Sequence, residues 1–368
     1  MARSKAQKKQ KTLGQKILLT VINIILILAL AFVILIVVLF ATEFRPQDRE
    51  SLEVFGEASK TISEGDSLTI LTFNTGYGAL GDNADFFLDG GSSVKTADKE
   101  RVLANMDGIA AAAMAAEPDV LFFQEVDVNS MRSSRVDEAE LLVNAFPDKE
   151  NVFAYNYRSL FIPYPIPPIG QVNAGILTES SFPIAEAERL QLPCPFSGIE
   201  RLGNLKRCLL VSRVPLEASD KELVLVNLHL EAYDSGEGKV AQTAMLRDFL
   251  EEEYEKGNYV IAGGDFNQIF SNIDMTNFPV YEDRWQPGVI DTAEFSEGWQ
   301  FIMDEEIPSC RSLDQPYLGA DPDTFQYYCI DGFIVSPNLT VQDAHAIDDG
   351  FVSSDHNPVV MKLTLQGE

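Results

Sequence analysis

Residues 222–267 read ELVLVNLHLEAYDSGEGKVAQTAMLRDFLEEEYEKGNYVIAGGDFN, and this stretch decides the fold. Short apolar runs rich in Val, Ile and Leu at 222–230 and 259–264 predict two strands, each buried on at least one face. The segment between them, 239–256, has helical apolar spacing and ends before Gly257, a residue type that commonly stops helices. We therefore expect a strand, a helix and a second strand, in that order.

The rest of the chain from residue 67 onward continues this alternation. A second helical pattern covers about 97–116 and ends before Pro118, because proline cannot continue a helix. Further strand-like runs lie at 67–73, 119–123, 174–178, 208–214, 328–335 and 358–365. This many strands with so few helices favours a sandwich of two sheets flanked by helices.

An uncharged apolar run covers residues 17–41. As a helix it would be about 37 Å long, enough to cross a hydrocarbon core of about 30 Å. It is too long for the apolar region of a cleaved signal peptide. Residues 1–16 carry six basic side chains and no acid, which favours a cytoplasmic N-terminus and an extracytoplasmic remainder. We expect a single-pass protein of the cell membrane.

Residues 42–66 are polar and acidic, and we expect them to form a stalk leading into one domain that covers 67–368. Beyond the first 41 residues, which hold six of the 28 basic side chains, the chain has 22 basic and 56 acidic ones, a formal charge of −34. Acidity of this size favours solubility and opposes non-specific binding to nucleic acid.

All four cysteines lie in the part expected outside the cell. In an oxidising exterior, Cys194 with Cys208 and Cys310 with Cys329 are the nearest pairings, and buried free thiols are the alternative. The spacings match no zinc motif.

Polar side chains stand at or near the ends of the predicted strands. Each has a plain structural explanation, because Asp and Asn favour turns and a lone histidine in an apolar strand is commonly a core residue. Together and in chain order they form a far more specific pattern: Asn74 in LTFNTG, Gln124 and Glu125 in LFFQEVD, His229 and Glu231 in LHLEAYD, Asp265 and Asn267 in GGDFNQ, Asp331 in IDGF, and Asp355 and His356 in SSDHNP.

In this order the segments resemble the endonuclease/exonuclease/phosphatase superfamily, in particular its deoxyribonuclease and neutral sphingomyelinase-like branches, over about residues 67–365. The resemblance implies an α/β fold, a four-layer α/β/β/α sandwich of two mostly antiparallel sheets, preceded here by one transmembrane helix. It implies that the protein is a metal-dependent hydrolase acting on phosphoric ester bonds. Within the superfamily, it would be a membrane-anchored bacterial member.

The resemblance also implies a metal site. Phosphoester cleavage needs a cation that neutralises charge on the phosphoryl oxygens, and Mg²⁺ prefers the oxygen ligands of carboxylates and amides. By resemblance, Glu125 is the principal ligand, with Asn74 and Asp355 beside it. The expected ion is Mg²⁺, and Mn²⁺ is the alternative.

The remaining polar residues are assigned to catalysis by the same resemblance. Asp265 would hold or deprotonate the attacking water, and Asn267 would orient that water or donate to the phosphate. His356 would contact the phosphoryl group, with its tautomer set by Asp331. His229 would be the acid for the leaving group, although the sequence leaves open which histidine is base and which is acid.

Two segments depart from the family pattern, GYGALGDNADFFLDGG at 76–91 and the proline-rich FIPYPIPPIG at 161–170. We expect both near the site entrance as specificity elements. The alternative is that they are surface loops with no role.

The expected substrate is a phosphodiester in a lipid headgroup or a small molecule. A strongly acidic domain repels long polyanions, and a membrane anchor at 17–41 holds the site beside lipid. A metal-dependent nuclease acting on extracellular nucleic acid is the alternative, and a catalytically silent binding module on the same fold is a second one. No protein partner is predicted.

Overall fold

The computed structural model describes residues 11–367. Of the predicted cytoplasmic segment 1–16, the first ten residues therefore lie outside the described residues. Two compact units divide the chain after Glu43. The first contains helix α1 (Leu13–Ala41), which is long and apolar enough to cross a membrane. Thr12 and Gln15 form a capping box at its start, so the helix begins before the predicted span.

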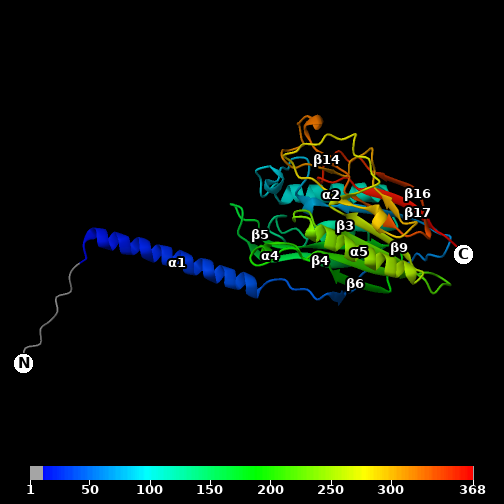
Figure 1. Ribbon diagram of the computed structural model, residues 1–368, viewed down its shortest axis with the longest axis horizontal. Coiled ribbons are helices and arrows are strands. Elements are labelled where there is room, and N and C mark those ends of the chain that lie inside the picture. The colour runs from blue at the N-terminus through cyan, green and yellow to red at the C-terminus, as the bar shows by residue number, and fades with distance from the viewer. Residues whose placement is uncertain (1–10, 368) are drawn as a thin grey trace, which may run out of the picture. The chain divides into compact units, whose positions relative to one another are not determined.

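The second unit is built on two sheets (Figure 1). The six-stranded sheet has the order β16-β17-β2-β3-β5-β4 and the seven-stranded sheet the order β1-β6-β7-β8-β9-β15-β12. The strands of the first are β2 (Ser67–Asn74), β3 (Val120–Asp127), β4 (Glu150–Ile162), β5 (Gly170–Ser180), β16 (Leu339–Ala346) and β17 (Val359–Leu365). Those of the second are β1 (Arg49–Ser51), β6 (Glu186–Gln191), β7 (Cys208–Pro215), β8 (Glu222–His229), β9 (Tyr259–Asp265), β12 (Gln300–Ile302) and β15 (Asp331–Val335).

Helices and two small strand pairs complete this unit. The helices are α2 (Lys99–Ala115), α3 (Glu138–Ala145), α4 (Glu200–Gly203) and α5 (Glu237–Glu255), with short 3₁₀ turns η1 (Gly76–Gly78), η2 (Phe87–Asp89), η3 (Thr292–Glu294) and η4 (Pro322–Thr324). The small pairs are β10 (Gln268–Phe270) with β11 (Gly288–Ile290), and β13 (Cys310–Arg311) with β14 (Tyr327–Tyr328).

Three apolar cores explain the layers. The central core joins the facing sides of the two sheets, for example Phe122 of β3 and Ile261 of β9. A second core packs α5 on the outer face of the seven-stranded sheet, and a third packs α2 and α3 on the outer face of the other. Because both faces of each sheet are covered, the strands read as nearly continuous apolar runs. The predicted four-layer α/β/β/α sandwich is confirmed.

Each sheet contains one parallel pair joined by a helix. Strands β2 and β3 are parallel and connected through α2, and strands β8 and β9 are parallel and connected through α5 (Figure 1). The other pairings within the two sheets are antiparallel. The carboxyl ends of parallel neighbours meet at one edge of a sheet, and this is where ligands commonly bind.

Several strands were missed by the apolar-run criterion. β4, β6 and β16 lie at or next to sheet edges, and polar residues interrupt their apolar pattern. In β16 these are mostly exposed, whereas in β4 and β6 several, such as Asn156 and Arg189, are buried. The segment 42–66, expected as a stalk leading into the domain, supplies the edge strand β1, which pairs with β6.

The four cysteines are unpaired in the structure. Cys208, Cys310 and Cys329 are buried and Cys194 is partly exposed. Of the two alternatives drawn from the sequence, the structure has free thiols.

One buried carboxyl group predicts a pH-dependent loss of stability. Glu179 of β5 is 0% exposed, and neither side-chain oxygen has a hydrogen-bond partner in the described part of the chain. Burial raises its pKa to about 8, against the attraction of Lys149. Because the unfolded chain releases this proton near pH 4.5, the folded state should lose stability as pH rises from about 5 to 8.

Glu179→Gln should remove this contribution. Each pKa unit corresponds to about 1.4 kcal/mol, so the variant should gain a few kcal/mol over the parent between about pH 5 and 8, measured by urea unfolding. Glu217→Gln makes the same change at an exposed position and should track the parent. Equal pH slopes for Glu179→Gln and the parent would show that the buried carboxylate is compensated.

Candidate active site

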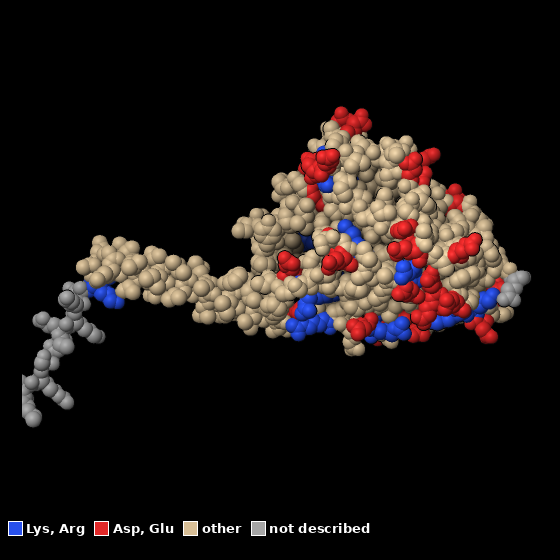
Figure 2. All heavy atoms as spheres, in the orientation of Figure 1, with Lys and Arg blue, Asp and Glu red and all other residues tan. Residues whose placement is uncertain are grey.

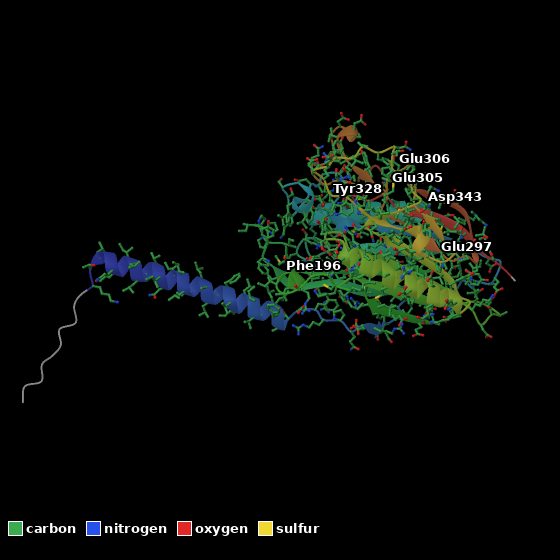
Figure 3. All side chains as sticks on the ribbon, viewed as in Figure 1. Phe196, Glu297, Glu305, Glu306, Tyr328 and Asp343 are labelled. Carbon is green, nitrogen blue, oxygen red and sulfur yellow. The ribbon has the colours of Figure 1, made fainter. Side chains whose placement is uncertain are left out.

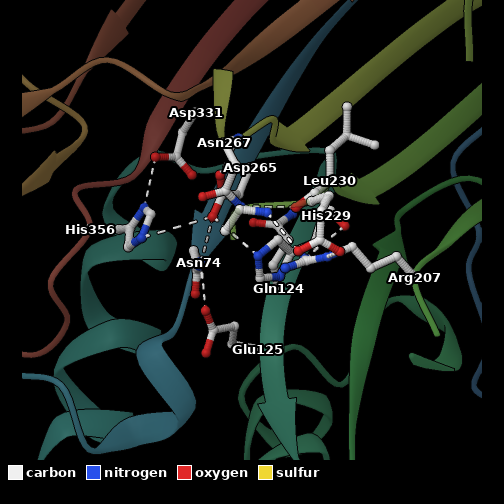
Figure 4. A network of polar contacts seen from close by, with 12 residues as sticks. Asn74, Gln124, Glu125, Arg207, His229, Leu230, Asp265, Asn267, Asp331 and His356 are labelled. Atoms are coloured by element: carbon white, nitrogen blue, oxygen red, sulfur yellow. Dashed lines mark hydrogen bonds and ion pairs between the residues drawn. The ribbon is translucent and has the colours of Figure 1, made fainter. Parts of the chain in front are cut away.

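Six of the eight predicted site residues line one cavity at the edge where the strand ends meet. These are Glu125, His229, Asp265, Asn267, Asp355 and His356. Asn74 and Asp331 lie behind them and are joined to them by hydrogen bonds (Figure 4). The structure therefore brings together all the residues that the sequence singled out.

The sheet register places three of these residues in one row. In the seven-stranded sheet, His229 at the end of β8 lies opposite Asp265 at the end of β9, and Asp265 lies opposite Asp331 at the start of β15. Gly264 makes the close approach of β8 and β9 possible, because a Cβ atom there would lie 1.9 Å from the Leu228 carbonyl oxygen.

Glu125 reaches the cavity through a β-bulge. The pairing of β3 with β5 shifts register between Phe123 and Val126, and Glu125 has a φ of 55°. Such a bulge re-aims a side chain that regular pleating would send elsewhere. Its neighbour Gln124 is buried between the sheets, where it donates to Asn227 Oδ1 over 2.8 Å.

Asn74 connects two carboxylates. Its Nδ2 donates to Asp265 Oδ2 over 2.9 Å and to Glu125 Oε1 over 3.3 Å, and its Oδ1 accepts from the Gly76 amide over 3.0 Å (Figure 4). Asn74 therefore presents a donor to the carboxylates, whereas a metal ligand must present an acceptor. In this arrangement it orients Glu125 and Asp265.

Asp265 is the centre of the polar network. Its Oδ1 accepts from the Asn267 amide over 2.8 Å. Its Oδ2 faces both imidazoles, at 3.4 Å from His229 Nε2 and 4.0 Å from His356 Nε2 (Figure 4). One carboxylate oxygen thus lies within ion-pair distance of both imidazoles.

His356 is held by a carboxylate on its far side. Nδ1 lies 2.8 Å from Asp331 Oδ2, and that same oxygen accepts from Ser309 Oγ over 2.7 Å. All three side chains are at least nine-tenths buried. Because Nδ1 is engaged, the ring is oriented with Nε2 toward the cavity.

Burial and neighbouring charges set the proton positions. Burial raises the pKa of Asp265 to about 7, with Asp331 adding to the rise and His356 opposing it. Burial raises the pKa of Asp355 to about 6; His356 opposes this and Glu125 adds to it.

The pKa values of the two histidines are shifted in opposite directions. Burial lowers the pKa of His229 well below its usual range, and the positive charge of Arg207 lowers it further. Burial also opposes the charge on His356, but Asp331 outweighs it and raises the pKa of His356 well above its usual range. At neutral pH, His356 is charged and His229 is neutral.

An ion pair that the sequence did not predict supports His229 from behind. Arg207 Nη1 donates to the His229 carbonyl over 3.1 Å, and its Nε lies 3.2 Å from Glu231 Oε2. Both side chains of the pair are buried. Glu231 stood out in LHLEAYD, but no local signal marks Arg207, which comes 24 positions earlier in the chain.

The cavity has a volume of about 370 Å³. Its walls include Phe86, Phe87 and Asp89 from segment 76–91, and Ile162, Tyr164 and Ile169 from segment 161–170. The rings of Phe87 and Tyr164 meet edge to face at 6.0 Å, so the two segments touch each other. Tyr233 closes another side by donating to the Asp89 carboxylate over 3.2 Å. The predicted position of both segments at the site is confirmed.

Each arginine that lines the cavity is already bonded to protein. Arg132 pairs with Asp127 at 2.9 Å, Arg284 pairs with Asp314 at 2.9 Å, and Arg207 pairs as described. Arg311 donates to the carbonyl oxygens of Gly81 and Ser312. A phosphate that enters the cavity therefore meets three guanidinium groups paired with carboxylates and a fourth, that of Arg311, which is held by carbonyl oxygens.

The outer surface carries much of the acidity. On the face seen in Figure 2, acidic side chains gather in patches and basic ones lie among them. Glu297, Glu306 and Asp343 are exposed, and Figure 3 shows them along one flank of the domain.

Comparisons with known proteins agree with this architecture. The Endonuclease/Exonuclease/phosphatase family profile matches residues 71–356. A solved endonuclease/exonuclease/phosphatase structure from Beutenbergia cavernae is similar with 20% identity and a TM-score of 0.54, over 82% of this chain and 72% of that one. One from Bacteroides vulgatus has 15% identity and a TM-score of 0.50, over 82% and 100%. TDP2 from Caenorhabditis elegans has 15% identity and a TM-score of 0.50, over 82% and 75%. No curated protein sequence matches the chain.

Proposed function

Because this chain belongs to the Endonuclease/Exonuclease/phosphatase family, we propose that it is a divalent-metal-dependent hydrolase of phosphoric esters. The observation that carries the proposal is the convergence on one cavity of Asp265, two further carboxylates and two histidines, whose Nε2 atoms both lie beside Asp265 Oδ2. This set can activate water, hold a proton and bind a cation, which are the needs of phosphoester hydrolysis.

The donor set fits Mg²⁺, with Mn²⁺ as the alternative. Glu125 and Asp355 offer hard carboxylate oxygens, and the charge of Glu125 adds to the rise that burial causes in the pKa of Asp355. A cation between them would relieve that repulsion. We propose Glu125 and Asp355 as its ligands, with Asn74 orienting Glu125. When bound, the ion would neutralise charge that develops on the phosphoryl oxygens.

The protein groups then divide the proton work. Asp265 would hold the attacking water. Asn267 would fix the turn that follows Asp265, since the Asn267 Nδ2 donates to the Leu230 carbonyl over 3.0 Å. His356 carries a proton and would donate to the phosphoryl oxygens, with Asp331 stabilising its charge. His229 is neutral and fits a proton acceptor better than the leaving-group acid that the resemblance implied.

The substrate that fits best is a phosphodiester in a lipid headgroup or a small molecule. The cavity is walled by aromatic side chains, and three of its four arginines are paired with carboxylates, so it offers few basic contacts to a long polyanion. Apolar side chains project beside it, with Tyr164 69% exposed and Ile166 93% exposed. Exposed apolar patches mark contact sites for proteins, ligands or membranes, and beside a phosphoester site a lipid substrate would use this one.

A nuclease acting on extracellular nucleic acid remains the second candidate, and a catalytically silent binding module the third. A nuclease needs several free basic contacts along the strand. A silent module would bind a phosphoester without turning it over.

A substrate comparison separates these candidates. At equal enzyme and Mg²⁺, we expect turnover of a lipid headgroup ester or a chromogenic phosphodiester, slow plasmid nicking, and little change between about 50 and 200 mM salt. A protein with six to ten phosphate contacts would lose about 10³- to 10⁵-fold in affinity over that range. Efficient nicking that falls steeply with salt, without lipid turnover, would favour the nuclease.

We further propose that α1 anchors the domain outside the cell, because six basic residues and no acid precede the apolar run, whereas Arg45 and Arg49 follow it among acidic residues. Protease added to intact cells should then remove the domain, while a cytoplasmic marker protein stays whole. Protection of the domain until the membrane is permeabilised would reverse the orientation.

A further inference from the structure

Three side chains of the cavity wall form a cluster that the proposed hydrolysis does not use as a unit. Cys310, Asp355 and His356 each offer one ligand atom, and the three atoms lie within 4.8 Å of one another. All three side chains are nine-tenths buried, and all three line the cavity. The cluster therefore faces the space where a small ion can enter.

The backbone holds the ligands of this cluster in place. Cys310 and His356 form an antiparallel bridge, so their side chains stand opposite each other. The Arg311 amide donates to the Asp355 carbonyl over 3.1 Å, and the Asn357 amide donates to the Ser309 carbonyl over 2.8 Å. Backbone hydrogen bonds on both sides of the cluster thus join two chain segments more than 40 positions apart.

His356 is prepared as a ligand by its second nitrogen. Nδ1 is engaged with Asp331 at 2.8 Å, which leaves Nε2 for an ion. A carboxylate behind a metal-binding imidazole fixes the ring and raises its basicity, and this is the usual support of zinc-bound histidines.

The cluster should prefer a different kind of metal ion from the proposed Mg²⁺ site at Glu125. A sulfur ligand and an imidazole select thiophilic cations such as Zn²⁺ and Cd²⁺, whereas Mg²⁺ accepts oxygen ligands. Three protein ligands with a fourth position open to the cavity match the coordination of an accessible zinc site.

We propose that Cys310, Asp355 and His356 form a second, inhibitory metal site for Zn²⁺ or a similar thiophilic divalent cation. Binding would convert the Cys310 thiol to a thiolate and the charged His356 to a neutral imidazole, releasing two protons to solvent with no redox change. The bound ion would withdraw Asp355 and the charged form of His356 from phosphoester hydrolysis. The inhibitory part rests on the proposed function, while the binding part does not.

The direct test uses Co²⁺ as a probe on the full chain in detergent micelles after treatment with a chelator. We expect a thiolate-to-cobalt absorption band that saturates on titration and is displaced by Zn²⁺. Cys310→Ser should abolish the band. Cys329→Ser removes another buried thiol, one that does not line the cavity, and should leave the band unchanged. No band in the parent protein, or an equal band in Cys310→Ser, would overturn the proposal.

The inhibition test adds Zn²⁺ to the Mg²⁺-supported reaction. Loss of an outer partner of a metal ligand already costs about 10- to 100-fold in affinity, so Cys310→Ser should raise the half-inhibitory Zn²⁺ concentration at least about tenfold. Cys329→Ser should match the parent, and unchanged inhibition of Cys310→Ser would refute the inhibitory role.

The experiments distinguish a misfolded variant, a failure of the proposed function and a failure of the proposed metal site. If Cys310→Ser fails to fold by circular dichroism, Asp355→Asn carries the binding test, with at least about tenfold weaker Co²⁺ binding expected and equal binding counting against the site. If no substrate is turned over, the proposed function fails, but the cobalt titration still decides whether the site exists.

Discussion

Asp265→Asn is expected to lower kcat by about 10²- to 10⁴-fold, because loss of a group that moves a proton in the reaction costs about that much. The change removes the carboxylate oxygen that faces both His229 Nε2 and His356 Nε2. It also sets an amide against the Asn74 amide nitrogen, which now donates to Asp265 Oδ2 over 2.9 Å. Turnover of the best substrate at saturating Mg²⁺ measures the effect.

The control for this variant is Asp274→Asn, an exposed aspartate outside the strand ends that form the site. It should keep full turnover. Both variants should retain the circular dichroism of the parent, since the oxygen of the new amide at position 265 can still accept from the Asn267 backbone N–H, as Asp265 Oδ1 does. Full activity of Asp265→Asn in a folded protein would remove Asp265 from the mechanism.

Glu125→Gln is expected to raise the Mg²⁺ concentration needed for half-maximal turnover by at least about 100-fold. Loss of an outer-shell partner alone costs about 10- to 100-fold in metal affinity, and loss of a charged ligand should cost more. The new amide would keep the shape of the Glu125 side chain and its bulged backbone, so the change is confined to charge. The measurement is activity as a function of Mg²⁺ and of Mn²⁺.

Glu217→Gln makes the same chemical change at an exposed position and should leave the Mg²⁺ dependence unchanged. Partial recovery of Glu125→Gln at high Mg²⁺ would support a ligand role. A fall in turnover that is independent of Mg²⁺ concentration would instead assign Glu125 to another step.

The layers of the fold followed from the sequence because most strands are covered on both faces. Continuous apolar runs such as 67–73 and 119–123 mark such strands directly. The polar residues at their ends were also readable, because each interrupts an apolar run at the point where the strand leaves the core. Strands β4 and β16 were not readable, since polar side chains break their apolar runs: exposed ones in β16 and largely buried ones in β4.

The finer structure of the site depends on long-range geometry that local sequence does not encode. The bulge that turns Glu125 arises from its pairing with β5, and the engagement of Arg207 with Glu231 joins two separate loops. The amide orientation of Asn74 depends on the Gly76 amide. The spacing of the cysteines gave no metal motif because Cys310 meets Asp355 and His356 only across a backbone bridge.

His229, Asp265 and Asp331 form a row across the seven-stranded sheet, so the strand register sets the relative positions of these three side chains. A substitution at an apolar position inside β8, β9 or β15 changes packing volume but leaves the row aligned, whereas a side chain at Gly264 would collide with the Leu228 carbonyl of β8. Insertion or deletion of one residue in any of these strands would turn its terminal acid or imidazole to the opposite face, because side chains alternate with a period of two. These strands are therefore fixed in length, and at Gly264 also in composition, whereas the segments 76–91 and 161–170 at the cavity can change length without moving the row.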